Sequence, residues 1–182
     1  MKRMVSIALG LLAVSAAAFA QMPAADALEK ALTPAPRQLK EGATVIKWKA
    51  DNTYETLRKG TNRLVCYDRS GEPGQQPFSV QCTSIANLDR VAQNRKFEAM
   101  EKTAKQAAID AAEANGTRVK PEYGSVWLTM NAADKEHARI HTTIAVPGAT
   151  TEKTGLPSDN KQGGVWIMNA GTTTAHLMTP GS

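Results

Sequence analysis

The chain has 182 residues, a formal net charge of +5 and 42% hydrophobic residues, which suits one ordinary domain with a core of its own. Acidic and basic residues are interleaved without a block of five like charges, and only 5% of the residues are aromatic. Because a nucleic-acid interface needs clustered basic residues and aromatic side chains for stacking, this composition argues against a nucleic-acid partner.

The first twenty residues have the pattern of a secretory signal peptide. A short basic start precedes an apolar run over residues 5–18, and Ala18 and Ala20 supply the small residues of a cleavage site. The apolar run is shorter than the roughly 20 residues of a membrane span, and no second run of that length follows. We therefore expect a signal peptide over residues 1–20, a mature chain beginning at Gln21, and a periplasmic or secreted location without stable membrane insertion after cleavage.

The segment after the leader has little pattern of its own. Residues 21–42 contain three prolines among alanines and charged residues. A turn or two of helix suits residues 24–32, but no strong apolar pattern requires the segment to pack on a core. We expect a flexible N-terminal arm over residues 21–42, followed by a single domain over residues 43–182.

The domain begins with three strand candidates. Residues 43–49, 54–58 and 62–67 are rich in strand-forming side chains, and turn signals separate them at residues 51–52 and 59–61. Because short turns join neighbouring strands in antiparallel order, we expect a three-stranded antiparallel meander.

Cys66 and Cys82 are the only cysteines in the chain. An even number of cysteines in an exported protein predicts a disulfide, and C-x-x-C spacing typical of metal or redox sites is absent. The segment between them contains two glycines and two prolines, which suits a flexible loop. On the chain-entropy model, closing a loop of this length stabilises the fold by about 3 kcal/mol.

A long helical pattern follows the second cysteine. From about residue 87 to residue 114 the chain is rich in alanine and contains neither proline nor glycine. Apolar residues recur at three- and four-residue steps, as on one face of a helix: Phe97, Met100, Ala104, Ala108 and Ala111. Because alanine dominates this face, it offers little area to a membrane or a partner, and we expect the helix to pack on the protein's own sheet.

The remaining elements are strands. Residues 125–130 are strand formers, residues 140–146 alternate cleanly between two faces, and residues 163–178 form a closing hairpin. The hairpin joins two apolar runs through Gly171, which accepts the positive φ of a tight connection. A long polar connection over residues 147–164 precedes it. Together the elements predict an α+β fold: a largely antiparallel sheet with one long helix packed on it.

These motifs in this order resemble an uncharacterised family of small exported bacterial proteins. The resemblance covers most of the chain after the leader, and its most specific part is the closing motif GGxWxM…GT…AHLMxP over residues 163–180. The other matching residues are Ile46, Trp48, Leu57, Arg58, Gly60, Thr61, Asn62, Cys66, Cys82, His141, Pro147 and Gly148. The resemblance implies export but no activity.

Two of the three histidines, His141 and His176, lie in strand candidates that could be neighbours. With Met178 they would offer imidazole and thioether ligands suited to copper, or imidazole ligands suited to zinc. Alternatively, the histidines are hydrogen-bonded structural groups and the methionine fills the core. His137 and His141 are spaced to share a metal only on a helix, and the strand pattern from residue 140 excludes that pair.

The closing hairpin also supplies a candidate pocket, formed by Trp166, Met168, His141 and His176. Tryptophan is scarce in this chain, so we interpret its three copies as core anchors. The alternative is an apolar ligand pocket lined by Trp48, Trp127 and Trp166.

No catalytic constellation is evident in the sequence. Signatures of α/β-hydrolases, P-loop enzymes, zinc peptidases and dinucleotide-binding enzymes are absent. Hydroxyl groups such as those of Ser125, Thr142 and Thr174 are too common to indicate a hydrolase with a histidine base. We expect no catalytic residues and no resident cofactor, and a structural or binding role in the periplasm or envelope. The partner would be a small ligand or an envelope protein. The alternative is a copper- or zinc-binding protein that uses His141 and His176.

The expected export has a direct test. When the chain is produced in a bacterium that exports it, the recovered protein should begin at Gln21, because signal peptidase cuts after the small-x-small pattern. Intact-mass measurement would show the loss of residues 1–20, and an Ala18→Leu, Ala20→Leu variant should keep them. Wild-type protein recovered with its leader intact would contradict the assignment.

Overall fold

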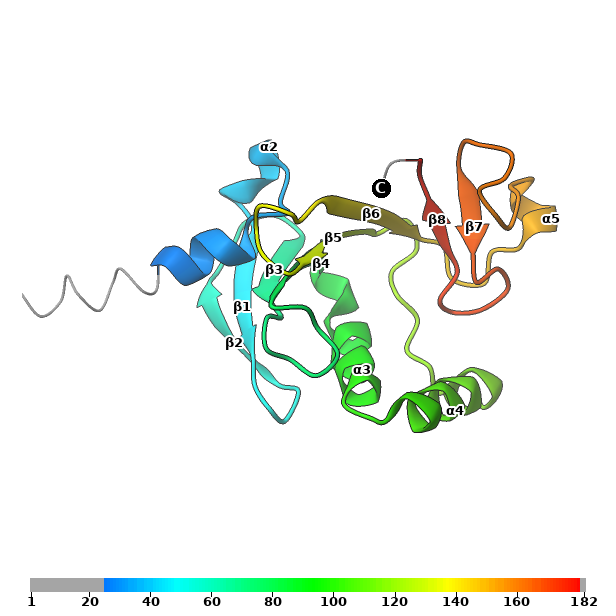
Figure 1. Cartoon of the computed structure of the whole chain (residues 1–182), viewed down its shortest axis with the longest axis horizontal. Coiled ribbons are helices and arrows are strands. Elements are labelled where there is room, and N and C mark those ends of the chain that lie inside the picture. Colours follow the sequence, from blue (N-terminus) through cyan, green and yellow to red (C-terminus); the bar gives the residue numbers. More distant parts are fainter. Residues whose placement is uncertain (1–24, 181–182) are drawn as a thin grey trace, which may run out of the picture.

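A computed structural model describes residues 25–180. The expected signal peptide, the cleavage point before Gln21 and the first residues of the expected arm lie outside the described residues. The strands are β1 (Thr44–Trp48), β2 (Tyr54–Arg58), β3 (Leu64–Asp68), β4 (Phe78–Ser84), β5 (Val126–Ala132), β6 (Ile140–Ala145), β7 (Trp166–Met168) and β8 (His176–Met178). They form one eight-stranded sheet in the order β2-β1-β3-β4-β5-β6-β8-β7 (Figure 1). Every neighbouring pair except β1 and β3 is antiparallel, so the expected α+β class is confirmed.

The first three strands are not ordered as the sequence predicts. β1 pairs antiparallel with β2 but parallel with β3, so the expected antiparallel meander is wrong. The physical reason is burial. Val65, Cys66 and Tyr67 of β3 are completely buried, which requires a place inside the sheet, whereas β2 is almost wholly exposed and forms an edge.

The connection from β2 to β3 crosses the end of β1 at Gly60. A Cβ at this position would lie 2.3 Å from the carbonyl oxygen of Gly42, so no larger residue fits the crossing. The same carbonyl oxygen accepts hydrogen bonds from the backbone N–H groups of Thr61, at 2.8 Å, and Asn62, at 2.9 Å. The Gly-Thr-Asn part of the recognised motif therefore has a structural role, because it holds this crossing together.

The expected disulfide is present. Cys66 in β3 and Cys82 in β4 are direct cross-strand partners with their Cα atoms 4.1 Å apart, and both are completely buried. The loop between them is shorter than the spacing of the two cysteines suggests, because β3 continues to Asp68 and β4 begins at Phe78. The bond therefore reinforces a hairpin that the backbone ladder already forms.

Most of the expected flexible arm is docked. Residues 25–31 are helical, and a second short helix, α2, spans Arg37–Lys40. Ala31 is only 2% exposed and belongs to the same core cluster as Cys66 and Cys82. Small side chains let this helix approach the disulfide closely, so from residue 25 onward the arm assignment is replaced by a helix that covers one face of the sheet.

The expected long helix is two helices. A 3-10 turn, η1 (Ile85–Asn87), leads into α3 (Leu88–Glu98), and α4 (Lys102–Ala114) follows after a break. α3 covers the opposite face of the sheet, where Leu88 and Val91 pack with Val65 and Tyr67. α4 extends away from the sheet (Figure 1), and Ala112 is its one buried residue.

Tertiary contacts explain this break, which no proline or glycine marks. Glu98, at the end of α3, forms an ion pair with the buried guanidinium of Arg69 in the β3–β4 loop. Near the end of α4, Glu113 accepts hydrogen bonds from Thr173, just before β8. The helices therefore point to two different parts of the sheet. The predicted apolar face stays largely in solvent, with Met100 42% exposed.

The closing hairpin agrees with the prediction. β7 and β8 pair with Trp166 opposite Met178 and with Met168 opposite His176, and Gly171 has a φ of +83°. The long polar connection before it contains a single helical turn, α5 (Thr151–Thr154).

Within residues 25–180, no helix has the length and apolar character needed to cross a membrane.

The disulfide should contribute measurably to stability. A Cys66→Ala, Cys82→Ala variant is expected to lose about 3 kcal/mol of unfolding free energy, because its unfolded chain is no longer cross-linked. Urea unfolding with an unconstrained slope would measure the loss. A reducing agent should destabilise the wild type and leave the variant unchanged. Equal stability of the oxidised wild type and the variant would contradict this role.

Candidate functional site

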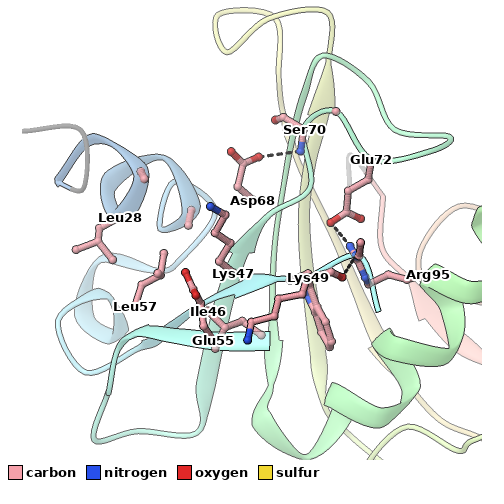
Figure 2. Close-up of a pocket in the computed structure, with 15 residues that line it drawn as sticks. Leu28, Ile46, Lys47, Lys49, Glu55, Leu57, Asp68, Ser70, Glu72 and Arg95 are labelled. Atoms are coloured by element: carbon pink, nitrogen blue, oxygen red, sulfur yellow. Dashed lines mark hydrogen bonds and ion pairs between the residues drawn. The ribbon is translucent and has the colours of Figure 1, made fainter. Parts of the chain in front are cut away.

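A groove of about 690 Å³ opens beside the N-terminal helix, at the β2 edge of the sheet (Figure 2). Apolar side chains that line it come from the helix over residues 25–31 and from the β1–β2 hairpin: Leu28, Ala31, Ile46, Trp48 and Leu57. Charged side chains that line it come from the hairpin, the end of β3, the following loop and α3: Lys47, Lys49, Glu55, Asp68, Glu72 and Arg95. We call this cavity the groove.

Trp48 anchors the inner side of the groove. Trp48 is 8% exposed, and its indole ring makes edge-to-face contacts with Tyr54, at 5.4 Å, and Tyr67, at 5.9 Å between ring centroids. The guanidinium carbon of Arg95 lies 5.1 Å from the centroid of the same ring. These three contacts fix the position of the Trp48 ring in the wall of the groove.

The charges around the groove are only partly paired. Asp68 lies 2.7 Å from the ammonium of Lys30, and Glu72 forms ion pairs with Arg95 and Arg69. Figure 2 shows Leu28 and Leu57 on one side and the Glu72–Arg95 pair on the other, with Lys47 between them. Three charged lining residues have no ion pair in the described part of the chain, namely Lys47, Lys49 and Glu55. The groove therefore has a small excess of available positive charge.

A second, smaller cavity of about 130 Å³ lies between α3 and the strands β5, β6 and β8. Its lining combines α3, the segment before β5, three strands and the segment before β8: Arg90, Asn94, Pro121, Trp127, Thr143, Ala145, Thr174, Ala175 and His176. We call it the Arg90 pocket.

Arg90 is 3% exposed and has no carboxylate within ion-pair distance among the described residues. Its guanidinium donates hydrogen bonds to the hydroxyls of Thr173, at 3.0 Å, and Thr174, at 2.8 Å, and to the carbonyl of Val119. The pKa of Arg90 is lowered to about 10, chiefly by burial and also by the charge of nearby Arg118, and the charge of Glu113 opposes both effects.

Glu113 balances this arginine indirectly. It accepts hydrogen bonds from the backbone N–H of Thr173 at 3.1 Å, from the Thr173 hydroxyl at 2.5 Å and from the Thr174 hydroxyl at 3.3 Å. The same two hydroxyls accept hydrogen bonds from Arg90, so the threonines link the two ionised groups through hydrogen bonds.

The residues of the predicted pocket are only partly brought together. Strand pairing places Trp166 beside Met178 and Met168 beside His176, and Met178 and His176 in turn lie beside Thr143 and Ala145 of β6. Because partners in register share a face, the four hairpin side chains lie on one face of the sheet.

His141 is separated from this group. His141 pairs with Thr129 of β5 and lies four residues before Ala145 in β6. Ala145 is the residue that pairs with His176. At about 3.4 Å per residue this separation is roughly 14 Å along the strand, so the two imidazoles do not share one site. No cluster of three or more histidine, cysteine, aspartate or glutamate residues suited to a metal occurs in the described range. His176 lies within hydrogen-bond distance of the Thr174 carbonyl, with its Nδ1 2.8 Å away.

Sequence reasoning does not single out Arg90 or Arg118. Arginine on a helix or in a loop is normally exposed, and nothing in its neighbours marks burial. The one usable signal is the i,i+4 spacing of Arg90 and Asn94 beside the apolar Leu88 and Val91, which places polar groups at the margin of the packed face.

Glu113 should make stability depend on pH. Burial tends to raise the pKa of Glu113, but the hydrogen bonds from Thr173, the charge of Arg90 and the Thr174 hydroxyl together hold it below 4.5. Because the pKa of Glu113 is lower in the folded chain than in the unfolded chain, its negative charge stabilises the fold at pH values above the unfolded-state pKa. This stabilisation is lost as the pH falls through the folded-state pKa. Glu113→Gln should therefore cost about 1 kcal/mol near neutral pH and less near about pH 3.

Urea unfolding at the two pH values would measure this difference. Glu55→Gln, at an exposed carboxylate without a hydrogen bond or ion pair in the described structure, is the matched control and should change stability little. A Glu113→Gln cost that does not shrink in acid would contradict the role of the charge.

Comparison with protein families, curated proteins and solved structures finds no match to this chain. Its function is therefore inferred from its own residues and their arrangement.

Proposed function

We propose that this protein is a non-enzymatic, exported binding protein that holds a small amphipathic anion in the groove. The observation that carries the proposal is the groove itself, a cavity of about 690 Å³ lined by both apolar and charged side chains. This size and this combination are typical of small-molecule sites, which are mostly apolar with a few polar groups that orient the ligand.

The lining indicates which part of a ligand would go where. Leu28 and Leu57 form an apolar wall, suited to a hydrocarbon body. Lys47 and Lys49 are free of ion pairs in the described structure and outnumber Glu55, so a negatively charged end is favoured over a positive one.

The disulfide supports an exported location, because such bonds persist in oxidising compartments. Together with the signal-peptide pattern of residues 1–20, it favours the periplasm, the envelope or the medium as the place of action. No catalytic residue is assigned. The Ser70 hydroxyl lines the groove, but it donates its hydrogen to the Ser79 carbonyl, and its partner Lys30 is ion-paired with Asp68.

The metal-binding alternative has less support. Copper or zinc held jointly by His141 and His176 would need the two imidazoles within a few ångströms, and their strand register keeps them apart. A site using His176 and Met178 alone would offer two ligands from one face of β8.

Titration calorimetry with decanoate tests the groove proposal. We expect saturable binding of one decanoate per chain, weakened about tenfold by Leu57→Ser, because the variant removes roughly 1 to 1.5 kcal/mol of apolar contact with the ligand. The matched control is Ile140→Ser. Ile140 and Leu57 are strand residues that are 46% and 42% exposed, but only Leu57 lines the groove.

Ligand charge provides the second comparison. Nonylamine has the same nine-carbon alkyl chain as decanoate with the opposite charge and should bind more weakly than decanoate. Lys47→Gln should reduce this difference in affinity. Absence of saturable decanoate binding, or equal effects of Leu57→Ser and Ile140→Ser, would refute the proposal.

A further inference from the structure

The Arg90 pocket has the features of a second ligand site, separate from the groove. We infer that it binds a small monocarboxylate, with Arg90 as the anchoring residue and Thr143 and Asn94 as further hydrogen-bond donors. The inference does not depend on the function proposed for the groove, since no residue lines both cavities.

The first argument is a charge imbalance. Arg90 and Arg118 are 3% and 6% exposed, and neither forms an ion pair with a carboxylate among the described residues. Glu113 is the acidic group that acts on both, and Glu98, the next acid to influence Arg118, is already paired with Arg69. The two buried guanidiniums therefore share one carboxylate, which leaves a net positive charge beside the pocket, and such a charge is costly unless an anion reaches it.

The second argument is an excess of donors. A guanidinium has five N–H donors, and Arg90 uses three of them on Val119, Thr173 and Thr174. Two remain available on a side chain that lines the pocket. A carboxylate is the acceptor that matches the fork of an arginine.

Two neighbouring side chains extend this donor set. The side-chain oxygen of Asn94 accepts a hydrogen bond from Arg118 at 2.6 Å, so the NH₂ group of Asn94 remains as a donor. The hydroxyl of Thr143 has no hydrogen-bond partner within the described part of the chain, and both residues line the pocket. No carboxylate lines the pocket to compete for these donors.

Size and lining select the ligand. A cavity of about 130 Å³ has the volume of about four water molecules, which admits an anion of only a few heavy atoms. Trp127, Ala145 and Ala175 add apolar surface beside the donors. A single uncompensated positive charge and an apolar wall favour a monoanion with a short hydrocarbon tail over phosphate or sulfate.

Titration calorimetry with propionate at constant ionic strength tests the inference, with phosphate and sulfate as alternative oxyanions and chloride as the background. We expect one propionate site per chain and weaker binding of the other anions. Arg90→Lys keeps the charge but loses the fork, and should weaken propionate binding by at least about tenfold.

Because Arg90 also links α3 to the segment before β8, a second pair of variants separates binding from folding. Thr143→Val removes a hydroxyl that lines the pocket, whereas Thr142→Val removes one from the opposite face of the same strand. Both threonines are half-buried and both changes suit a strand. Thr143→Val should weaken propionate binding about fivefold and Thr142→Val should leave it unchanged.

Four outcomes would overturn the inference: no saturable binding of propionate; tighter binding of phosphate or sulfate than of propionate; equal effects of Thr143→Val and Thr142→Val; or full binding in a folded Arg90→Lys variant. The first would leave Arg90 with a purely structural role, joining α3 to Thr173 and Thr174.

Discussion

The pairing of β3 with β4 is the constraint on which the rest of the structure depends. β3 is buried on both faces, so each face of the sheet needs its own cover. On one face Cys66 and its disulfide partner pack beneath the helix over residues 25–31, and on the other Val65 and Tyr67 pack beneath α3. A strand in this position cannot lie at an edge, and the parallel pairing with β1 and the crossing at Gly60 follow from that requirement.

Buried arginines divide the molecule into a balanced region and an unbalanced one. Near the groove, Arg69 and Arg95 are matched by Glu72 and Glu98, which fixes the β3–β4 loop against α3. Such a network mainly fixes the positions of its side chains and adds little to the unfolding free energy, because the cost of desolvating the charges offsets much of their attraction. Near the closing hairpin, Arg90 and Arg118 share the charge of one glutamate, Glu113, and of the two only Arg90 is linked to it through threonine hydroxyls. Guanidinium and carboxylate groups therefore have a structural role near the groove, whereas near the closing hairpin they support a ligand site.

The two cavities also differ in how the fold forms them. Within the described part of the chain, the helix over residues 25–31 leaves apolar side chains of the β1–β2 hairpin such as Leu57 open to solvent, and the groove lies beside them. The Arg90 pocket lies beside α3, between that helix and β5, β6 and β8, and α4 turns away from the sheet (Figure 1). Each cavity lies where helical cover of the sheet ends, and apolar surface and unsatisfied polar groups remain together at such margins.

Local chemistry determined much of this protein directly from its sequence. The disulfide followed from two cysteines beside a leader pattern, and the closing hairpin followed from two short apolar runs joined through Gly171, because both depend on neighbouring residues and simple periodicity. Only the tertiary structure decided the parallel place of β3, the break between α3 and α4, the docking of the N-terminal helix and the separation of His141 from His176. Those features depend on strand register and on which distant surfaces are buried together. The burial of Arg90 depends on the same contacts, because an arginine on a helix has the same sequence pattern whether it faces water or a pocket.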